Sequence, residues 1–264
     1  MIDRGKWPRG RLNNAVRSRV LILGGTAQGR ALAARLASIP GVEATYSLSG
    51  ATRKPLRVPV PTRAGGFGGA AGMADYLRRS RTRCVVDATH PFATSISTVA
   101  ARVCTELDLP LAVLSRPPWT PGPDDHWHRV EDLRQAADLV EQLRVPTVFL
   151  TIGSRGLAPF VANAQPHYLV RSIEPPALEL PTGRFELILE RGPFDADSEV
   201  ELFKARAVNA LVTKNSGGQA TYGKVLAARR LRLPVVMVER PVKTPSTSLF
   251  DIDQTLDWIA RQMR

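Results

Sequence analysis

The feature that most constrains the fold of this chain is a regular alternation of short β-branched runs with segments of helical periodicity. Apolar runs at Val20–Leu23, Val42–Leu48 and Cys84–Thr89 are each followed by an amphipathic stretch, and the same rhythm continues through the rest of the sequence. This order predicts parallel strands joined by crossover helices that cover both faces of a sheet. We therefore expect an α/β protein with doubly wound, mainly parallel sheets.

The alternation is interrupted by a proline-rich segment, RPPWTPGPDD, at 116–125, which divides the 264 residues into two halves. The halves share a frame, because Leu107–Pro117 reads LDLPLAVLSRP and Leu231–Pro241 reads LRLPVVMVERP. Chance can produce such a match in a chain of many strand–helix turns, but the shared frame favours two related Rossmann-like domains. We predict a disordered basic tail over 1–18, a nucleotide-binding domain over 19–118, and a second domain that contributes to substrate binding over 119–264.

The net charge of +12 is distributed unevenly along the chain. Residues 1–19 hold five arginines and one lysine against one aspartate, and the remaining positive charge is spread through loops. Dispersed basic loops suit a polyanionic small molecule at least as well as nucleic acid. No apolar run approaches the roughly 20 residues of a membrane span, and the N-terminus lacks a signal-peptide core, so we expect a cytoplasmic protein. Cys84 and Cys104 form no CxxC pair, which indicates buried apolar side chains rather than metal or redox chemistry.

The stretch Val20–Ser38, VLILGGTAQGRALAARLAS, has the form of a nucleotide-binding turn between a strand and a helix. Gly24 allows the tight turn, Gly25 or Thr26 lines the close approach, and Gly29 lets the helix approach the strand. Backbone N–H groups and the helix N-terminus are then available to a pyrophosphate. Thr26 stands where the usual fingerprint has its middle glycine, so an ordinary glycine turn remains an alternative.

The choice of nucleotide depends on the stretch YSLSGATRK. An NAD site places an acid about 20 residues after the glycine turn, and none is present here. Ser49, Thr52, Arg53 and Lys54 instead offer the hydroxyl and guanidinium groups that a ribose 2′-phosphate needs, which favours NADPH over a solvated turn. The glycine loop RAGGFGG, 63–69, either approaches the cofactor with its backbone or is a mobile loop tip.

Further candidates follow predicted strands in each half. In VVDATHPFATS, the imidazole of His90 is placed for ligand contact or proton transfer. His126 and His128 have no third ligand nearby and are expected to be surface loop residues rather than a metal site. In VTKNSGGQATYGK, Lys214, Asn215 and the residues after them predict a basic, donor-rich pocket suited to carboxylates or phosphate.

Taken in order and spacing, GGTAQGR, SGATRK, RAGGFGG, DATHPFA, LSRPPW, RGPF and TKNSGG resemble the precorrin-6A reductase family of cobalamin biosynthesis. The resemblance extends from about Val20 to the last helix, and it implies an NADPH-dependent oxidoreductase that saturates one carbon–carbon double bond of a tetrapyrrole, giving precorrin-6B. Gln28 departs from the family pattern, which often has an acid there. The macrocycle's acetate and propionate carboxylates would account for the basic loops.

Site residues follow from the motifs and the resemblance together. The residues expected to bind the cofactor are Gly24, Gly25, Thr26, Gln28, Gly29, Ser49, Thr52, Arg53, Gly66, Phe67 and Thr89. Those expected to bind the substrate are His90, Pro91, Arg191, Lys214, Asn215, Ser216, Gly217 and Lys224, with His90 or solvent as the proton source. No metal, nucleic acid or membrane partner is expected, and a monomer is compatible with the sequence.

Two other functions stay open at this point. One is an NADP-dependent reductase of the short-chain or sugar-nucleotide type, which is disfavoured because the sequence has no suitable Tyr-x-x-x-Lys: Tyr222 and Lys224 are too close together. The other is a non-enzymatic module that senses a dinucleotide, whose basic tail would contact nucleic acid. The sequence also leaves open whether the tetrapyrrole carries cobalt.

Overall fold

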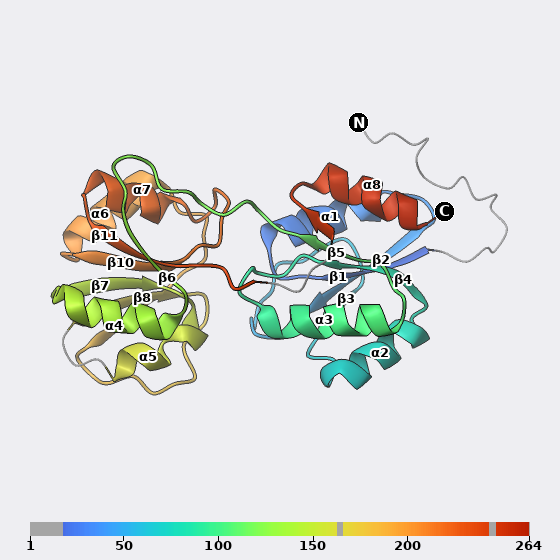
Figure 1. The fold of residues 1–264 in the computed structure, drawn as a ribbon, viewed down its shortest axis with the longest axis horizontal. Coiled ribbons are helices and arrows are strands. Elements are labelled where there is room, and N and C mark those ends of the chain that lie inside the picture. The colour runs from blue at the N-terminus through green and yellow to red at the C-terminus, as the bar shows by residue number, and fades with distance from the viewer. Residues whose placement is uncertain (1–17, 163–165, 243–246, 264) are drawn as a thin grey trace. The chain divides into compact units, whose positions relative to one another are not determined.

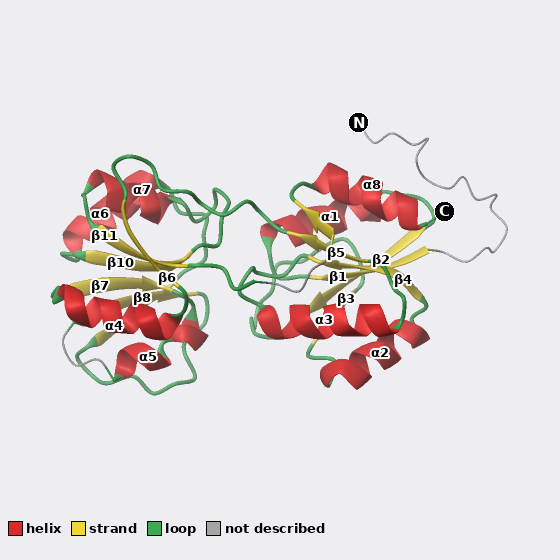
Figure 2. Cartoon of the chain, viewed as in Figure 1, coloured by secondary structure: helices red, strands yellow, loops and turns green. Residues whose placement is uncertain are grey.

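The computed structural model describes residues 18–162, 166–242 and 247–263, which form two compact units. Unit 1 contains the described residues up to Arg116 and those from Val242 onward, and unit 2 contains Pro117–Pro241. Each unit has a six-stranded sheet with helices on both faces (Figures 1 and 2). Every strand pairing in the described residues is parallel, so the expected doubly wound α/β fold is confirmed.

The elements of unit 1 are β1 (Ser18–Leu23), α1 (Ala27–Ala37), β2 (Val42–Leu48), β3 (Thr62–Ala64), α2 (Gly69–Arg79), β4 (Thr82–Asp87), α3 (Thr94–Glu106), β5 (Leu111–Leu114), β12 (Thr247–Leu249) and α8 (Ile252–Gln262). Its strand order is β12-β5-β4-β1-β2-β3. On β1, Val20 and Ile22 pack towards α1 and α8, whereas Leu21 and Leu23 pack towards α2 and α3 (Figure 1). Because both faces are covered, the strand is an unbroken apolar run.

The elements of unit 2 are β6 (His126–Val130), α4 (Leu133–Leu143), β7 (Thr147–Thr151), a 3-10 turn (Ser154–Gly156), α5 (Ala158–Val161), β8 (His167–Ser172), β9 (Phe185–Leu189), α6 (Ala196–Ala205), β10 (Ala210–Lys214), α7 (Gly223–Arg230) and β11 (Pro234–Val238). The strand order is β6-β11-β10-β7-β8-β9. Helices α6 and α7 cover one face and α4 the other (Figure 1). Position by position, this order matches that of unit 1.

The structure corrects the expected extent of the second domain. We expected 119–264 to form one domain, but β12 pairs with β5 and α8 packs against α1, so the last segment belongs to unit 1. The physical reason is that β5 needs a neighbour on its open side, and a three-residue strand supplies it. Ser18, expected in the tail, begins β1, and residues 1–17 lie outside the described residues.

Three short strands, β3, β6 and β12, were not predicted. His126 and His128 lie on β6 rather than in a loop, and their side chains are exposed as expected. Among the described residues, no cluster of His, Cys, Asp or Glu could hold a metal ion. No helix in the described part of the chain is long and apolar enough to cross a bilayer.

Candidate functional site

Three sequence motifs meet at one edge of the unit 1 sheet because the strands before them are neighbours. Leu23 at the end of β1 pairs with Ser47 of β2 on one side and with Asp87 of β4 on the other. The GGTAQG turn, the SGATRK loop and the DATHPFA loop therefore begin side by side at the carboxyl edge. The strand order reverses between β1 and β4, and such switch points are where doubly wound sheets bind ligands.

Tyr46 shapes the glycine turn from beneath. Its hydroxyl accepts a hydrogen bond from the Gly25 backbone N–H at 2.8 Å. A Cβ added to Gly24 would lie 2.2 Å from Tyr46 Cζ, so only glycine fits at that position. Burial raises the pKa of Tyr46, more than the Gly25 N–H lowers it, and the phenol stays protonated. An aromatic residue on the neighbouring strand was the one hint of this contact in the sequence.

Thr26 occupies the middle fingerprint position for a reason that the structure makes clear. Its hydroxyl accepts from the Gly29 N–H at 3.1 Å as the N-cap of α1, and it donates to the Ala88 carbonyl at 2.7 Å. The threonine thus caps the helix and connects the ends of β1 and β4 across the switch point. Gly25 has φ of +120°, and an added Cβ there would meet no described atom within 4 Å, so the outer face of the turn is open. Together with the first N–H groups of α1, this open backbone fits a pyrophosphate.

Arg63 braces the glycine loop beside this turn. Its guanidinium donates to Ser47 Oγ at 2.7 Å and to the Gly66 carbonyl at 2.9 Å, and it lies 3.8 Å from the centre of the Phe67 ring. The Gly65 N–H donates to the Leu48 carbonyl, which keeps the loop next to the SGATRK segment. Sequence reasoning missed Arg63, although an arginine directly before a glycine–aromatic run was a usable signal.

The SGATRK segment continues from β2 at the same edge as the glycine turn. Ser49 and Arg53 are exposed and Thr52 is half-buried, so all three side chains are accessible to a ligand. The Gly24 N–H donates to the Ser47 carbonyl at 2.8 Å, which keeps this segment next to the turn. Gln28, in the first turn of α1, instead donates to the Phe250 carbonyl of the segment before α8.

Asp87 organises the DATHPFA loop. One carboxylate oxygen accepts from the Thr89 N–H and hydroxyl at 3.0 and 2.6 Å, and the other accepts from Ser97 Oγ at 2.6 Å. His90 Nδ1 accepts from the Phe92 N–H at 3.3 Å, so the neutral ring carries its proton on Nε2. Thr89 and His90 are half-exposed, and Pro91 is buried beneath them. The role of Asp87 as the support of this loop was not anticipated.

Asn215 has a different role from the one predicted. Its side chain is fully buried, with Oδ1 accepting from the Trp119 N–H at 2.8 Å and Nδ2 donating to the Trp119 carbonyl at 3.1 Å. Both polar groups thus hold the proline-rich segment, and we replace the expected substrate contact by this supporting role. Lys214, the last residue of β10, is half-buried, and burial lowers its pKa.

The other predicted residues of unit 2 divide by exposure. Arg191 is exposed, whereas Ser216 and Gly217 are buried, and a Cβ on Gly217 would lie 2.1 Å from the Pro117 carbonyl. Lys224 is only 7% exposed in the first turn of α7, and its Nζ lies 5.6 Å from the centre of the Trp119 ring. Burial lowers the pKa of Lys224 to about 8, although the Glu199 carboxylate opposes this shift. Arg191 and Lys214 are therefore the accessible cations of the predicted set.

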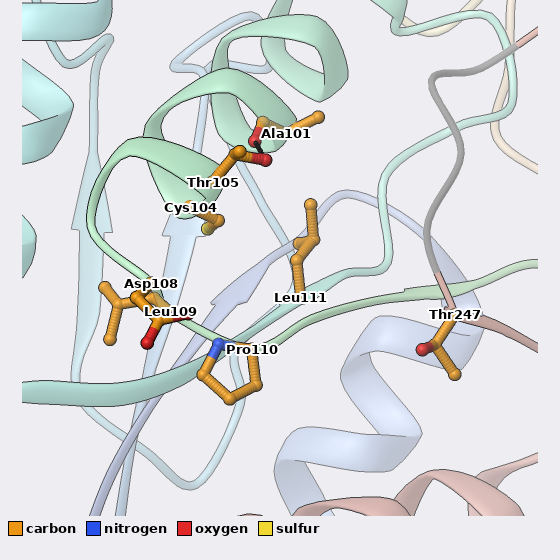
Figure 3. Close-up of a pocket in the computed structure, with 8 residues that line it drawn as sticks. All are labelled: Ala101, Cys104, Thr105, Asp108, Leu109, Pro110, Leu111 and Thr247. Atoms are coloured by element: carbon orange, nitrogen blue, oxygen red, sulfur yellow. Dashed lines mark hydrogen bonds between the residues drawn. The ribbon is translucent and has the colours of Figure 1, made fainter.

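A separate hollow of about 440 Å³ in unit 1 lies away from these motifs. Figure 3 shows it lined by Cys104 and Thr105 of α3, by Pro110 before β5 and by Thr247 at the start of β12. These residues lie towards the amino end of β5, whereas the glycine turn follows the carboxyl end of β1. The hollow is therefore not part of the candidate site.

A parallel sheet with a capped glycine turn at its switch point gives unit 1 the architecture of a Rossmann-like α/β domain, and the second unit has the same strand order. The family model of precorrin-6x reductase CbiJ/CobK matches residues 19–260. The chain belongs to this family, as the motifs led us to expect.

Relatives and a solved structure agree with this assignment. The chain is 45% identical to a precorrin-6A reductase of Rhodococcus erythropolis, covering 94% of this chain and 99% of the relative. It is 29% identical to a cobalt-precorrin-6A reductase of Salmonella typhimurium, covering 84% and 87%. The structure of CobK precorrin-6A reductase matches with a TM-score of 0.87 at 39% identity, covering 93% of this chain and 97% of that one.

Proposed function

We propose that the chain reduces one carbon–carbon double bond of precorrin-6A with NADPH as the hydride donor, giving precorrin-6B. The observation that carries the proposal is the meeting of three family motifs at the switch point of unit 1, around a glycine turn whose outer backbone face is open. Membership of the reductase family supplies the reaction class.

The nucleotide would be held at the edge formed by β2, β1 and β4. Gly25 and the first turn of α1 would take the pyrophosphate, and Ser49, Thr52 and Arg53 would take the ribose 2′-phosphate. Ser49 and Arg53 are exposed beside the glycine loop that Arg63 braces. When bound, the dihydronicotinamide supplies the hydride, and the protein's task is to orient it and to exclude water.

The substrate carboxylates would be bound by accessible cations. Of the cations in the predicted set of unit 2, Arg191 is exposed and Lys214 is half-buried, whereas Lys224 is buried. The neutral His90 ring, with its proton on Nε2, can donate a hydrogen bond to the substrate. Its imidazolium form would be needed to donate a proton, and solvent is the other proton source.

The substrate is further proposed to lack cobalt. The chain is 45% identical to the Rhodococcus precorrin-6A reductase but 29% identical to the Salmonella enzyme named for the cobalt form. A closer match to the cobalt-free group supports the metal-free macrocycle as substrate.

The experiment that tests the function is an absorbance assay with precorrin-6A. The purified chain should change the visible spectrum of the tetrapyrrole. One molecule of NADPH should be oxidised for each molecule of precorrin-6A that is reduced. Parallel reactions with NADH and with cobalt-precorrin-6A separate the two finer claims. No spectral change with either tetrapyrrole would contradict the proposed reaction.

The nucleotide preference is tested by Arg53→Ala. A charge-assisted hydrogen bond contributes roughly 1.5–3 kcal/mol, so this variant should lose about 10- to 150-fold in NADPH affinity while NADH affinity barely changes. Arg57→Ala, which removes another exposed arginine of the same loop, is the matched control and should bind NADPH like the wild type. Equal affinity of the wild type for NADH and NADPH would rule out the 2′-phosphate site.

A further inference from the structure

A buried ion pair lies beneath the loops of unit 2, and the functional assignments above do not use it. Arg171, next to the end of β8, and Glu199, in the first turn of α6, have side chains that are 6% and 2% exposed. Arg171 Nη1 donates to Glu199 Oε1 at 2.6 Å. Well-packed apolar residues often replace such a pair without loss of stability, so its presence calls for another explanation.

The guanidinium of Arg171 lies against two aromatic rings. Its Cζ is 4.0 Å from the centre of the Phe194 ring and 4.9 Å from that of Phe149. Glu199 fixes the guanidinium from the helix side, and the Glu190 carboxylate lies 3.4 Å from Nε. Phe149 belongs to the core, whereas Phe194 belongs to the RGPF loop. The planar cation therefore connects the RGPF loop to a residue of the hydrophobic core.

Phe194 also contacts the loop after β10. Its N–H donates to the Ala220 carbonyl at 3.1 Å. A Cβ added to Gly223 would lie 2.5 Å from the Phe194 carbonyl oxygen, so the two main chains are in direct contact. The segments 191–194 and 215–223 are thus in direct contact. Arg191 begins the first segment, and Lys214 directly precedes the second.

We propose that Arg171 is a positioning residue for substrate binding: by stacking on Phe194 it holds the RGPF loop, and through Ala220 the turn after β10, so that Arg191 and Lys214 keep the spacing that the substrate carboxylates require. The proposal rests on the proposed function, because it takes this edge of unit 2 as a substrate-binding surface. Glu199 orients the guanidinium and touches no substrate.

The variants must remove the buried charges in pairs. Glu199 faces the charges of both Arg171 and Lys224, so removing it alone would leave Arg171 with only the more distant Glu190 carboxylate and would take from Lys224 the carboxylate that faces it. The first test variant is Arg171→Met with Glu199→Met, which removes both charges of the ion pair. Because it also takes the Glu199 carboxylate away from Lys224, a second test variant keeps Glu199. Arg171→Lys keeps the charge opposite Glu199 but loses the planar face. The control is Arg206→Met with Glu186→Met, a solvent-exposed ion pair in the same unit.

The measurements are the KM values for precorrin-6A and NADPH, the thermal unfolding temperature, and hydrogen exchange of segments 191–194 and 215–223. We expect the double Met variant and Arg171→Lys to raise KM for precorrin-6A about tenfold, with KM for NADPH unchanged. Exchange should quicken in both segments of these variants, and the control pair should change neither reading.

Contrary outcomes are distinct from failure of the proposed function. Hydrogen exchange needs no substrate, so unchanged protection of both segments in the double Met variant overturns the positioning role even if the wild type proves inactive. An active wild type whose Arg171→Lys variant keeps a normal KM shows that charge alone suffices, which overturns the stacking role. A parallel fall in unfolding temperature and NADPH affinity would mean that the pair only stabilises the fold.

Discussion

At the scale of single residues, Thr26 stabilises the glycine turn through its side chain, whereas the usual fingerprint has a glycine without a side chain at this position. Its hydroxyl is satisfied twice, once by the Gly29 N–H and once by the Ala88 carbonyl. The close approach to a phosphate is left to Gly25, where the backbone is open and φ is positive. The threonine therefore supports the turn, and restoring the glycine should bring no benefit.

Thr26→Gly is expected to lower the free energy of unfolding by about 1 kcal/mol, from the lost hydrogen bond to Ala88 and a weaker helix cap. Nucleotide affinity should not improve. Chemical denaturation and an NADPH titration measure the two quantities, and Thr26→Ser, which keeps both hydrogen bonds, is the control. A variant that binds NADPH more tightly than the wild type would show that position 26 limits the approach of the phosphates.

Residues that carry their own local signal were predictable, and residues that act through distant partners were not. Gly24, Gly25 and Gly29 follow from a strand–turn–helix pattern within one stretch. Tyr46 contacts the glycine turn that follows another strand, and Asp87 contacts Ser97 of the helix that follows its own strand. No rule of sequence spacing predicts such contacts. Asn215 was predicted to bind the substrate, but a polar residue after a strand can also form hydrogen bonds with the main chain, as Asn215 does with Trp119.

At the scale of elements, the proline-rich segment is a fixed part of unit 2 rather than a free linker. Trp119 is held by Asn215, and its indole N–H donates to the Gly218 carbonyl at 2.8 Å. Further along, both carboxylate oxygens of Asp125 accept from the Arg229 guanidinium of α7, at 3.0 and 2.8 Å. The segment thus lies over the loop that carries the TKNSGG motif and restricts its movement.

This attachment should depend on pH. Burial raises the pKa of Asp125, but hydrogen bonds from Arg229 and the Gly122 N–H lower it further than burial raises it. The pKa in the folded state is thus below the unfolded value of about 3.9, so the contribution is present above pH 4 and is lost as the pH falls through the folded value.

Asp125→Asn should therefore lower the free energy of unfolding by about 2 kcal/mol at pH 7, with the gap to wild type closing towards pH 3. Urea denaturation at several pH values measures it. Asp197→Asn, which removes the carboxylate of an exposed ion pair with Arg230, is the control and should show a small gap at every pH. A gap of constant size for Asp125→Asn would mean that the carboxylate's charge is not what holds the segment.

Long periodic elements could be predicted from the sequence, and short edge strands could not. The helices and the central strands of both sheets have enough residues to show a period or an apolar run. By contrast, β3 and β12 each have three residues, and β6 is largely polar, with exposed His126 and His128. Their strand character comes from a neighbouring strand that offers free backbone groups, which is information that no local window contains.

At the scale of the whole molecule, the matched strand orders show how the chain is shared between the two units. After β5 the chain passes through Arg116 and Pro117 into unit 2 and forms β6, which pairs with β11. After β11 it passes through Arg240 and Pro241 and forms β12, which pairs with β5. Each crossing thus supplies the other unit's edge strand and the helix after it, and the shared Arg-Pro frame marks both crossings.

The observed units can be distinguished by experiment from two domains that meet at residue 118, as the sequence predicted. Ile259 of α8 and Val140 of α4 are both fully buried on helices that follow an exchanged edge strand. Ile259→Ala should cost about 2–5 kcal/mol of stability because it leaves a cavity in the core shared with α1. Hydrogen exchange should then quicken in β5 and α1 of unit 1, while the strands of unit 2 keep their protection. Val140→Ala should give the reverse pattern, and faster exchange in β10 and β11 of Ile259→Ala would show that the last helix supports unit 2 after all.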